Sequence, residues 1–147
     1  MAYNNALSTY KETKVKTAGQ GQLIIMLYDE AVKQLTRAIE LMESNTQKKD
    51  PGKIEQISKA VMKTEEINTE LMVSLDFERG GEISKNLFSL YSWFNRELLE
   101  ANIAQDTNRI KTVRDMLADL RGTWSQIVTK QPGDSGNREN AGINIAG

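Results

Sequence analysis

The sequence contains neither cysteine nor histidine. The absence of cysteine excludes disulfide bridges, thiolate nucleophiles and zinc sites built on sulfur, and it fits a reducing compartment. The absence of histidine removes the commonest general base and the commonest transition-metal ligand. We therefore expect a protein that is not an enzyme and that needs no cofactor.

A strong net charge and long apolar runs are lacking as well. The chain has 19 basic and 20 acidic residues. This balance gives no net positive charge that would attract the phosphates of nucleic acid. Its longest apolar run, Leu23 to Tyr28, is far shorter than the ~20 residues of a membrane-spanning helix, and Asp29 ends it too soon for a signal peptide. We expect a soluble, cytoplasmic protein that neither binds nucleic acid nor inserts into a membrane.

Proline is scarce, and the long stretches between the two prolines, Pro51 and Pro132, carry apolar residues three and four apart. This spacing is typical of helices. It predicts four of them, over residues 20–44, 51–76, 82–105 and 107–129, with a turn at residues 79–81. A capping box from Thr17 to Gln20 is expected to open the first helix, Asp50 the second and Asp106 the fourth. Short connections predict an all-α, antiparallel up-down four-helix bundle.

The two ends of the chain differ from this central domain, residues 17–130. Residues 1–16 carry only a weak apolar pattern, including Leu7 and Tyr10, and are expected to form an N-terminal cap segment on the bundle. Residues 131–147 are rich in glycine, asparagine and serine. Such a segment cannot offset its ordering entropy, so we expect a flexible tail.

Two helices carry more apolar side chains than one buried face requires. On the first, Leu23, Met26 and Leu27 cannot all share the face of Ile24 and Tyr28. On the third, the core stripe begins at Ile83, and three further apolar residues lie off it: Phe88, Leu99 and Ile103. Either each helix has two neighbours in the bundle, or a groove takes an amphipathic partner helix, or the surplus forms a homo-oligomer.

Polar side chains within the apolar faces are open to two interpretations. Asn68 lies on the apolar side of the second helix, and Asn102 lies between Leu99 and Ile103 on the third. Each is expected to make an interhelical hydrogen bond that fixes the register, or to recognise the backbone of a ligand. The spacing of Glu66 and Glu70 would suit a di-iron site in a four-helix bundle, but that class of site also needs histidine ligands. The chain has no histidine, so no metal site is expected.

Several short motifs together resemble the FliS family of flagellin export chaperones. They are Thr17-Ala18-Gly19-Gln20-Gly21-Gln22-Leu23, Met26-Leu27-Tyr28-Asp29, Glu70-Leu71, Ser74-Leu75-Asp76, Gly80-Gly81-Glu82, Asn86-Leu87, Leu90-Tyr91, Leu98, Glu100-Ala101-Asn102, Asp106, Leu117, Leu120-Arg121 and Trp124. The order and spacing of these motifs follow the family from about Tyr10 to Trp124.

The resemblance implies a four-helix bundle that binds the C-terminal segment of flagellin, prevents its premature polymerisation in the cytosol and delivers it to the flagellar export gate. In the family, the N-terminal segment covers part of the hydrophobic groove, and Tyr10 matches its aromatic residue. Where many relatives carry Asn-Pro-Tyr, this chain has Asn5-Ala6-Leu7.

The apolar surplus and the resemblance together give one set of predicted partner-binding residues: Leu7, Tyr10, Leu23, Met26, Leu27, Asn68, Phe88, Leu99, Asn102 and Ile103. The alternative is a homodimeric helical structural or adaptor protein, in which the same faces join two copies and no flagellin is bound.

Overall fold

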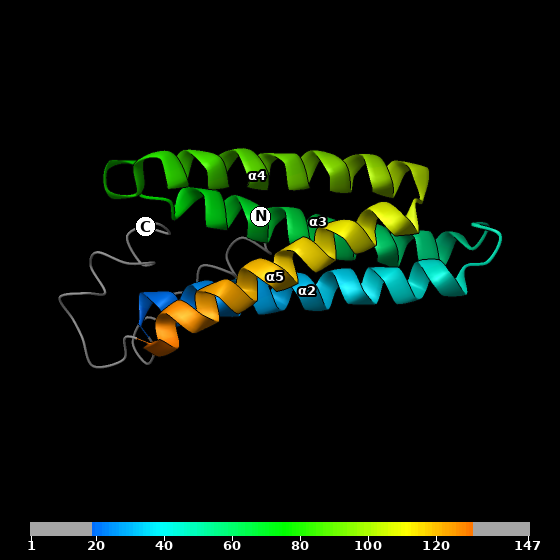
Figure 1. The fold of residues 1–147 in the computed structure, drawn as a ribbon. Helices are drawn as coiled ribbons and strands as arrows, with labels where there is room; N and C mark the ends of the chain where they lie inside the picture. The colour runs from blue at the N-terminus through cyan, green and yellow to red at the C-terminus, as the bar shows by residue number, and fades with distance from the viewer. Residues whose placement is uncertain (1–18, 131–147) are drawn as a thin grey trace.

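A computed structural model of the chain describes residues 19–130, which form four α-helices (Figure 1). The helices are α2 (Gln20–Ser44), α3 (Pro51–Val73), α4 (Phe77–Ala104) and α5 (Thr107–Lys130). Consecutive helices run in opposite directions along one elongated bundle (Figure 1). The predicted antiparallel up-down bundle is confirmed, whereas the predicted cap segment and tail lie outside the described residues.

The side chains of two aspartates begin two of the helices, as the sequence predicts. The carboxylate of Asp50 accepts hydrogen bonds from the backbone amides of Gly52 and Lys53, at 2.9 and 3.3 Å. Asp106 accepts one from the amide of Arg109 at 3.2 Å. Since the first amides of a helix have no partner within the helix, these bonds fix where α3 and α5 begin.

The starts of α2 and α4 differ from prediction. The N-cap of α2 is Gly19, which has no side chain to accept a hydrogen bond, so the predicted capping box is wrong. In α4, the carboxylate of Asp76 accepts from the amides of Glu78 and Arg79 at 3.1 Å each, which starts a helical turn at Phe77 rather than at residue 82.

The predicted turn at the glycines is present as a kink inside α4. Gly81 has φ 50° and ψ −122°, a conformation that glycine adopts far more easily than other residues. The helical turn from Phe77 to Gly80 is therefore set at an angle to the rest of α4. The predicted core position of Ile83, two residues after the kink, is wrong, because its side chain is exposed.

Helix α2 is buried along most of its length, because it packs against α3 on one flank and α5 on the other. Helical spacing from Ile24 predicts one inner stripe, and the structure buries all of its residues: Ile24, Tyr28, Ala31, Leu35, Ala38 and Met42. In the core, the hydroxyl of Tyr28 is hydrogen-bonded to that of Tyr91 on α4. Burial raises the pKa of both phenols, that of Tyr91 to about 12, so both stay neutral.

Candidate functional site

Large apolar side chains that remain exposed to solvent gather on one hairpin of the bundle. In the part of the chain that the structure describes, all of them belong to α3 and α4: Met62, Val73, Phe77, Ile83, Phe88, Leu99 and Ile103. Exposed apolar patches on soluble domains usually mark binding sites. The α3–α4 hairpin is therefore the candidate docking surface.

The predicted site residues of α4 lie on this surface. Phe88 is 42% exposed, Leu99 53% and Ile103 76%. All three lie off the buried stripe of α4, which contains Phe94 and Leu98. On this helix, the interpretation of surplus apolar residues as an available surface agrees with the structure.

The predicted site residues of α2 are placed differently. Leu23 and Leu27 are 2% and 1% exposed, and Met26 is half-buried. The expectation that Leu23 and Leu27 border a free groove is wrong. Helix α2 packs against α3 and α5, so its additional apolar side chains are buried in the bundle. Leu7 and Tyr10 lie outside the described residues.

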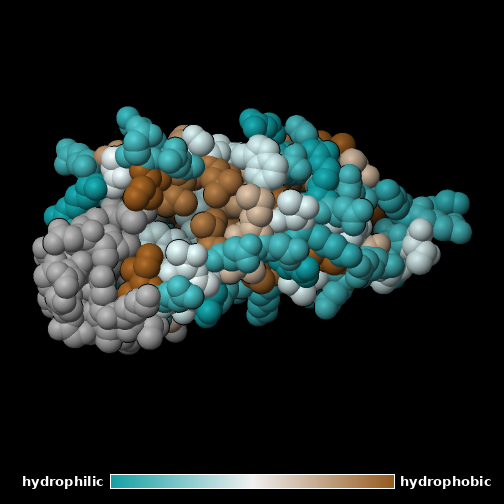
Figure 2. Space-filling model, viewed as in Figure 1, coloured by the Kyte–Doolittle hydropathy of each residue, from teal (hydrophilic) through white to brown (hydrophobic). Residues whose placement is uncertain are grey.

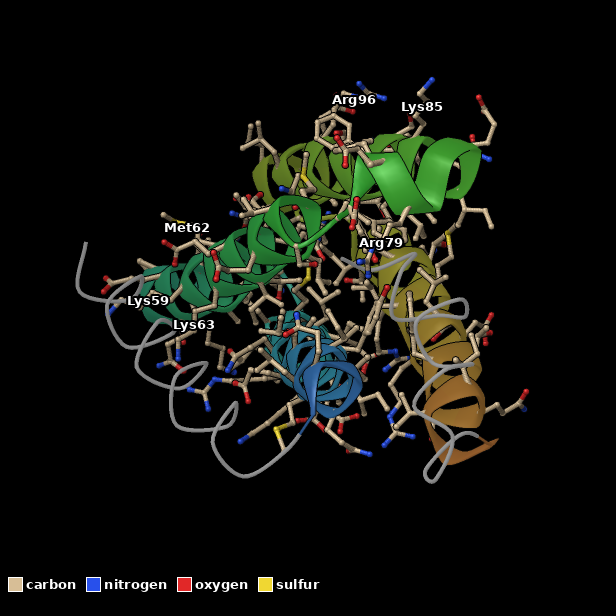
Figure 3. The ribbon with its side chains drawn as sticks, turned by 90° about the vertical axis from the view of Figure 1, so that its left-hand side faces the viewer. Lys59, Met62, Lys63, Arg79, Lys85 and Arg96 are labelled. Carbon is tan, nitrogen blue, oxygen red and sulfur yellow. The ribbon has the colours of Figure 1, made fainter. Side chains whose placement is uncertain are left out.

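A groove of about 600 Å³ runs between α3 and α4 in the middle of the candidate surface. It is lined by Met62, Glu65, Glu66, Thr69, Glu70, Asn95, Arg96 and Leu99. Figure 3 shows Met62 on the side of α3 that faces α4, with Arg96 on α4 itself. The groove has an apolar side chain on each wall, Met62 on α3 and Leu99 on α4, and charged side chains around them. This arrangement suits the binding of an amphipathic segment.

The two predicted asparagines join α3 to α4 through side-chain hydrogen bonds. Asn68 donates to Oδ1 of Asn95 at 3.0 Å, and Nδ2 of Asn95 reaches Oγ1 of Thr69 at 3.4 Å. Asn102 pairs with Ser58, with Nδ2 3.2 Å and Oδ1 3.3 Å from its Oγ. The predicted interhelical hydrogen bonds are confirmed, and they fix the register of α3 against α4.

One buried acceptor at this seam is not satisfied within residues 19–130. Oδ1 of Asn68 is buried, yet it accepts no hydrogen bond from the described residues. A buried acceptor without a donor costs about 1–3 kcal/mol. Nearby, partial burial of Glu65 raises the pKa of its carboxyl group. Of these two groups, only Glu65 lines the groove, so a partner that covers it would bury its carboxyl group further.

One end of the surface is aromatic. The rings of Phe77 and Phe88 meet edge to face, with centroids 5.9 Å apart. Sequence reasoning missed Phe77, and it also missed Met62. Met62 directly follows the buried Ala60 and Val61, and a single exposed apolar residue is ordinary on a protein surface, so nothing in the sequence set it apart. For Phe77, the signal was available, because Asp76 is a good N-cap and places it in the first turn of a helix.

A second apolar region opens on the other flank of α4. Figure 2 shows apolar atoms in a hollow between α4 and the C-terminal half of α5, where Figure 1 shows the two helices diverging. Both helices have half-buried apolar side chains packed against the core, among them Leu87 and Leu90 on α4 and Leu120 and Ile127 on α5. The helical spacing of all four predicts core positions, but they are only partly buried. Helix α4 therefore carries accessible apolar groups on both flanks.

In residues 19–130, no helix is long and apolar enough to span a bilayer.

The sequence profile of the family described as "Flagellar protein FliS" matches residues 3–131. The "Flagellar secretion chaperone FliS" of Salmonella typhimurium strain LT2 is 39% identical over 119 residues, 81% of this chain and 84% of that protein. The protein of the same description from Escherichia coli K12 is 36% identical, over 78% of this chain and 80% of its own length. That from Bacillus subtilis strain 168 is 29% identical, over 91% and 94%.

Proposed function

Because this chain belongs to the FliS family of flagellar proteins, we propose that it is a flagellar secretion chaperone, not an enzyme, and that its client is flagellin. In this proposal it binds the C-terminal region of flagellin in the cytosol, prevents premature polymerisation and delivers the client to the flagellar export gate. The observation that carries the proposal is that, within residues 19–130, all the large exposed apolar side chains lie on the α3–α4 hairpin.

The energetics of such a surface favour a helical client. An amphipathic helix laid along α3 and α4 would remove apolar groups of both partners from water, including Met62, Phe88, Leu99 and Ile103. At about 25 cal/mol per Å², 400 Å² of apolar area contributes about 10 kcal/mol before the entropy of association is subtracted. This is enough for stable capture, provided that the client's own ordering cost is moderate.

The N-terminal segment enters the same proposal as a competitor. Residues 1–16 would cover part of the apolar surface through Leu7 and Tyr10 when no client is bound. Capture of flagellin would then be an exchange of one apolar contact for another. Deleting residues 1–16 should tighten binding of a flagellin C-terminal peptide in calorimetry, whereas weaker binding would make the segment part of the interface.

The client surface is tested with the same peptide and two charged substitutions. Phe88→Asp and Leu99→Asp should each weaken binding about tenfold or more, because a carboxylate would be buried against an apolar partner. Both residues are exposed in the free protein, so the helical circular dichroism should not change. Gln126→Asp, at an exposed position on α5, is the matched control and should bind normally. Unchanged affinity in both α4 variants would reject this surface.

The homodimeric alternative makes a different prediction for the same residues. Light scattering of the free protein should give a monomer, and addition of flagellin should give a one-to-one complex. A stable dimer that does not bind flagellin, and that Leu99→Asp dissociates, would favour a structural or adaptor protein instead.

A further inference from the structure

A second groove, of about 700 Å³, lies on the other flank of α3, between α2 and α3. It is lined by Lys33, Gln34, Thr36, Arg37, Glu40, Gln56, Lys59, Ala60 and Lys63. Four of these side chains are cationic and one is a carboxylate. The chain as a whole has a formal charge of −1, so this local excess of positive charge is a property of the groove.

The two flanks of α3 are opposite in sign. The groove toward α4 contains three carboxylates and one cation, together with the apolar side chains of Met62 and Leu99. Figure 3 shows Lys59 and Lys63 on the α2 side of α3, away from Met62. A segment that suits one groove therefore does not suit the other, and the two surfaces select different partners.

Within residues 19–130, intramolecular pairing leaves the positive charge of Lys33, Arg37 and Lys59 available. Lys59 lies 3.4 Å from Glu55, but both side chains are at least 70% exposed, and such surface pairs contribute little. Within residues 19–130, neither Lys33 nor Arg37 has a carboxylate oxygen within 4 Å. The carboxylate of Glu30 accepts a hydrogen bond of 2.7 Å from Gln34.

The spacing of the cations defines what would fit between them. Lys33 and Arg37 are four residues apart on α2, and Lys59 and Lys63 are four residues apart on α3. Residues at this spacing lie one above the other on a helix, with Cβ atoms about 5–6 Å apart. Each wall thus presents one cation per turn, and the buried Ala60 at the floor lets a backbone approach closely.

We propose that the α2–α3 groove binds an acidic helical segment of a partner protein, with carboxylates one turn apart facing both walls. This partner and flagellin could bind at the same time, because the acidic segment would leave the apolar surface on α3 and α4 uncovered. Charge complementarity carries the proposal, since opposite potentials across an interface set both partner choice and the rate of association.

The test uses a labelled, alanine-rich helical peptide with glutamate at every fourth position, and a matched peptide with glutamine in its place. In fluorescence anisotropy at low salt, the glutamate peptide should bind at least tenfold more tightly than the glutamine peptide. Raising the salt to 300 mM should remove most of the difference, because salt screens exposed charges. Equal binding of the two peptides would overturn the proposal.

Two charge reversals locate the binding. Lys59→Glu should weaken binding of the glutamate peptide about tenfold, since one attraction becomes a repulsion. Lys85→Glu is the matched control: it reverses an exposed lysine on α4 that lies 4.0 Å from a glutamate on its own helix, and should change affinity less than twofold. Equal effects of the two reversals would show a response to net charge and overturn the proposal.

The flagellin peptide separates this inference from the proposed function. It should bind Lys59→Glu as tightly as the unmodified chain, and it should not displace the glutamate peptide. Displacement would overturn the claim of a separate groove. Failure of the flagellin peptide to bind would refute the proposed client while leaving the result with the acidic peptide unaffected.

Discussion

The contact between Gly21 and Val128 gives the sharpest test of how the bundle is packed. Gly21 is buried in the first turn of α2, and a Cβ atom built on it would lie 2.6 Å from Cγ2 of Val128 on α5. Overpacking of this kind typically costs about 1–3 kcal/mol. Alanine also has a helix propensity up to about 1 kcal/mol better than glycine, so Gly21→Ala should lose about 1 kcal/mol net.

The sign should reverse when the valine is shortened. Cβ of Val128 lies 3.8 Å from the added atom, an ordinary contact, so Val128→Ala removes the clash completely. In that background Gly21→Ala should be neutral or stabilising by up to about 1 kcal/mol, a coupling of about 1–2 kcal/mol between the two sites. Urea unfolding followed by circular dichroism measures all four proteins of the cycle.

A glycine in the partner helix is the control for propensity. A Cβ atom on Gly122 of α5 would meet no other atom within 4 Å, so Gly122→Ala should stabilise by up to about 1 kcal/mol. If the Gly21→Ala and Val128→Ala effects simply add, the close approach of α2 and α5 does not constrain residue 21, and the reasoning is wrong.

Three further predictions concern hydrogen bonds and pH. Tyr28→Phe should cost about 1–2 kcal/mol, because it leaves the buried hydroxyl of Tyr91 without its partner; the double variant should cost less than the sum in the same urea assay. If flagellin buries Glu65 further, its pKa rises again and binding takes up a proton, so calorimetry should show tighter binding at pH 5 than at pH 7, but not in Glu65→Gln. Arg109 donates two hydrogen bonds to Glu97 and lowers the pKa of that carboxyl. The stability this provides is present above the ordinary glutamate pKa of about 4.3 and is lost as the pH falls through the lowered value; acid unfolding of Glu97→Gln should lack this component.

Much of the fold could be predicted because its determinants are local. The apolar spacing from residue 20 to 44 gives both ends of α2, and Asp50 and Asp106 give the starts of α3 and α5. The start of α4 was predicted at residue 82 because Gly80 and Gly81 were interpreted as a turn between two helices. The carboxylate of Asp76 caps a helix before them, and one glycine can sit inside a helix as a kink.

The candidate site was harder to predict because exposure depends on neighbours rather than on the helix itself. In the sequence, Leu27 and Leu99 both lie outside the predicted core stripe of their helices. In the structure Leu27 is buried and Leu99 is exposed. The difference is that α2 has partners on both flanks whereas α4 packs less extensively against α3 and α5. The basic groove escaped notice for a related reason: Arg37 and Lys59 are 22 residues apart in sequence, and only packing brings them to one surface.

The backbone geometry of Gly81 determines how far the apolar surface of α4 extends. The kink directs the short helical turn before it so that the rings of Phe77 and Phe88 meet edge to face and close one end of the surface. Any other residue at position 81 would be strained at φ 50°, even though there is ample space for its side chain. A single achiral residue therefore limits the length of helix that this side of the molecule can accommodate.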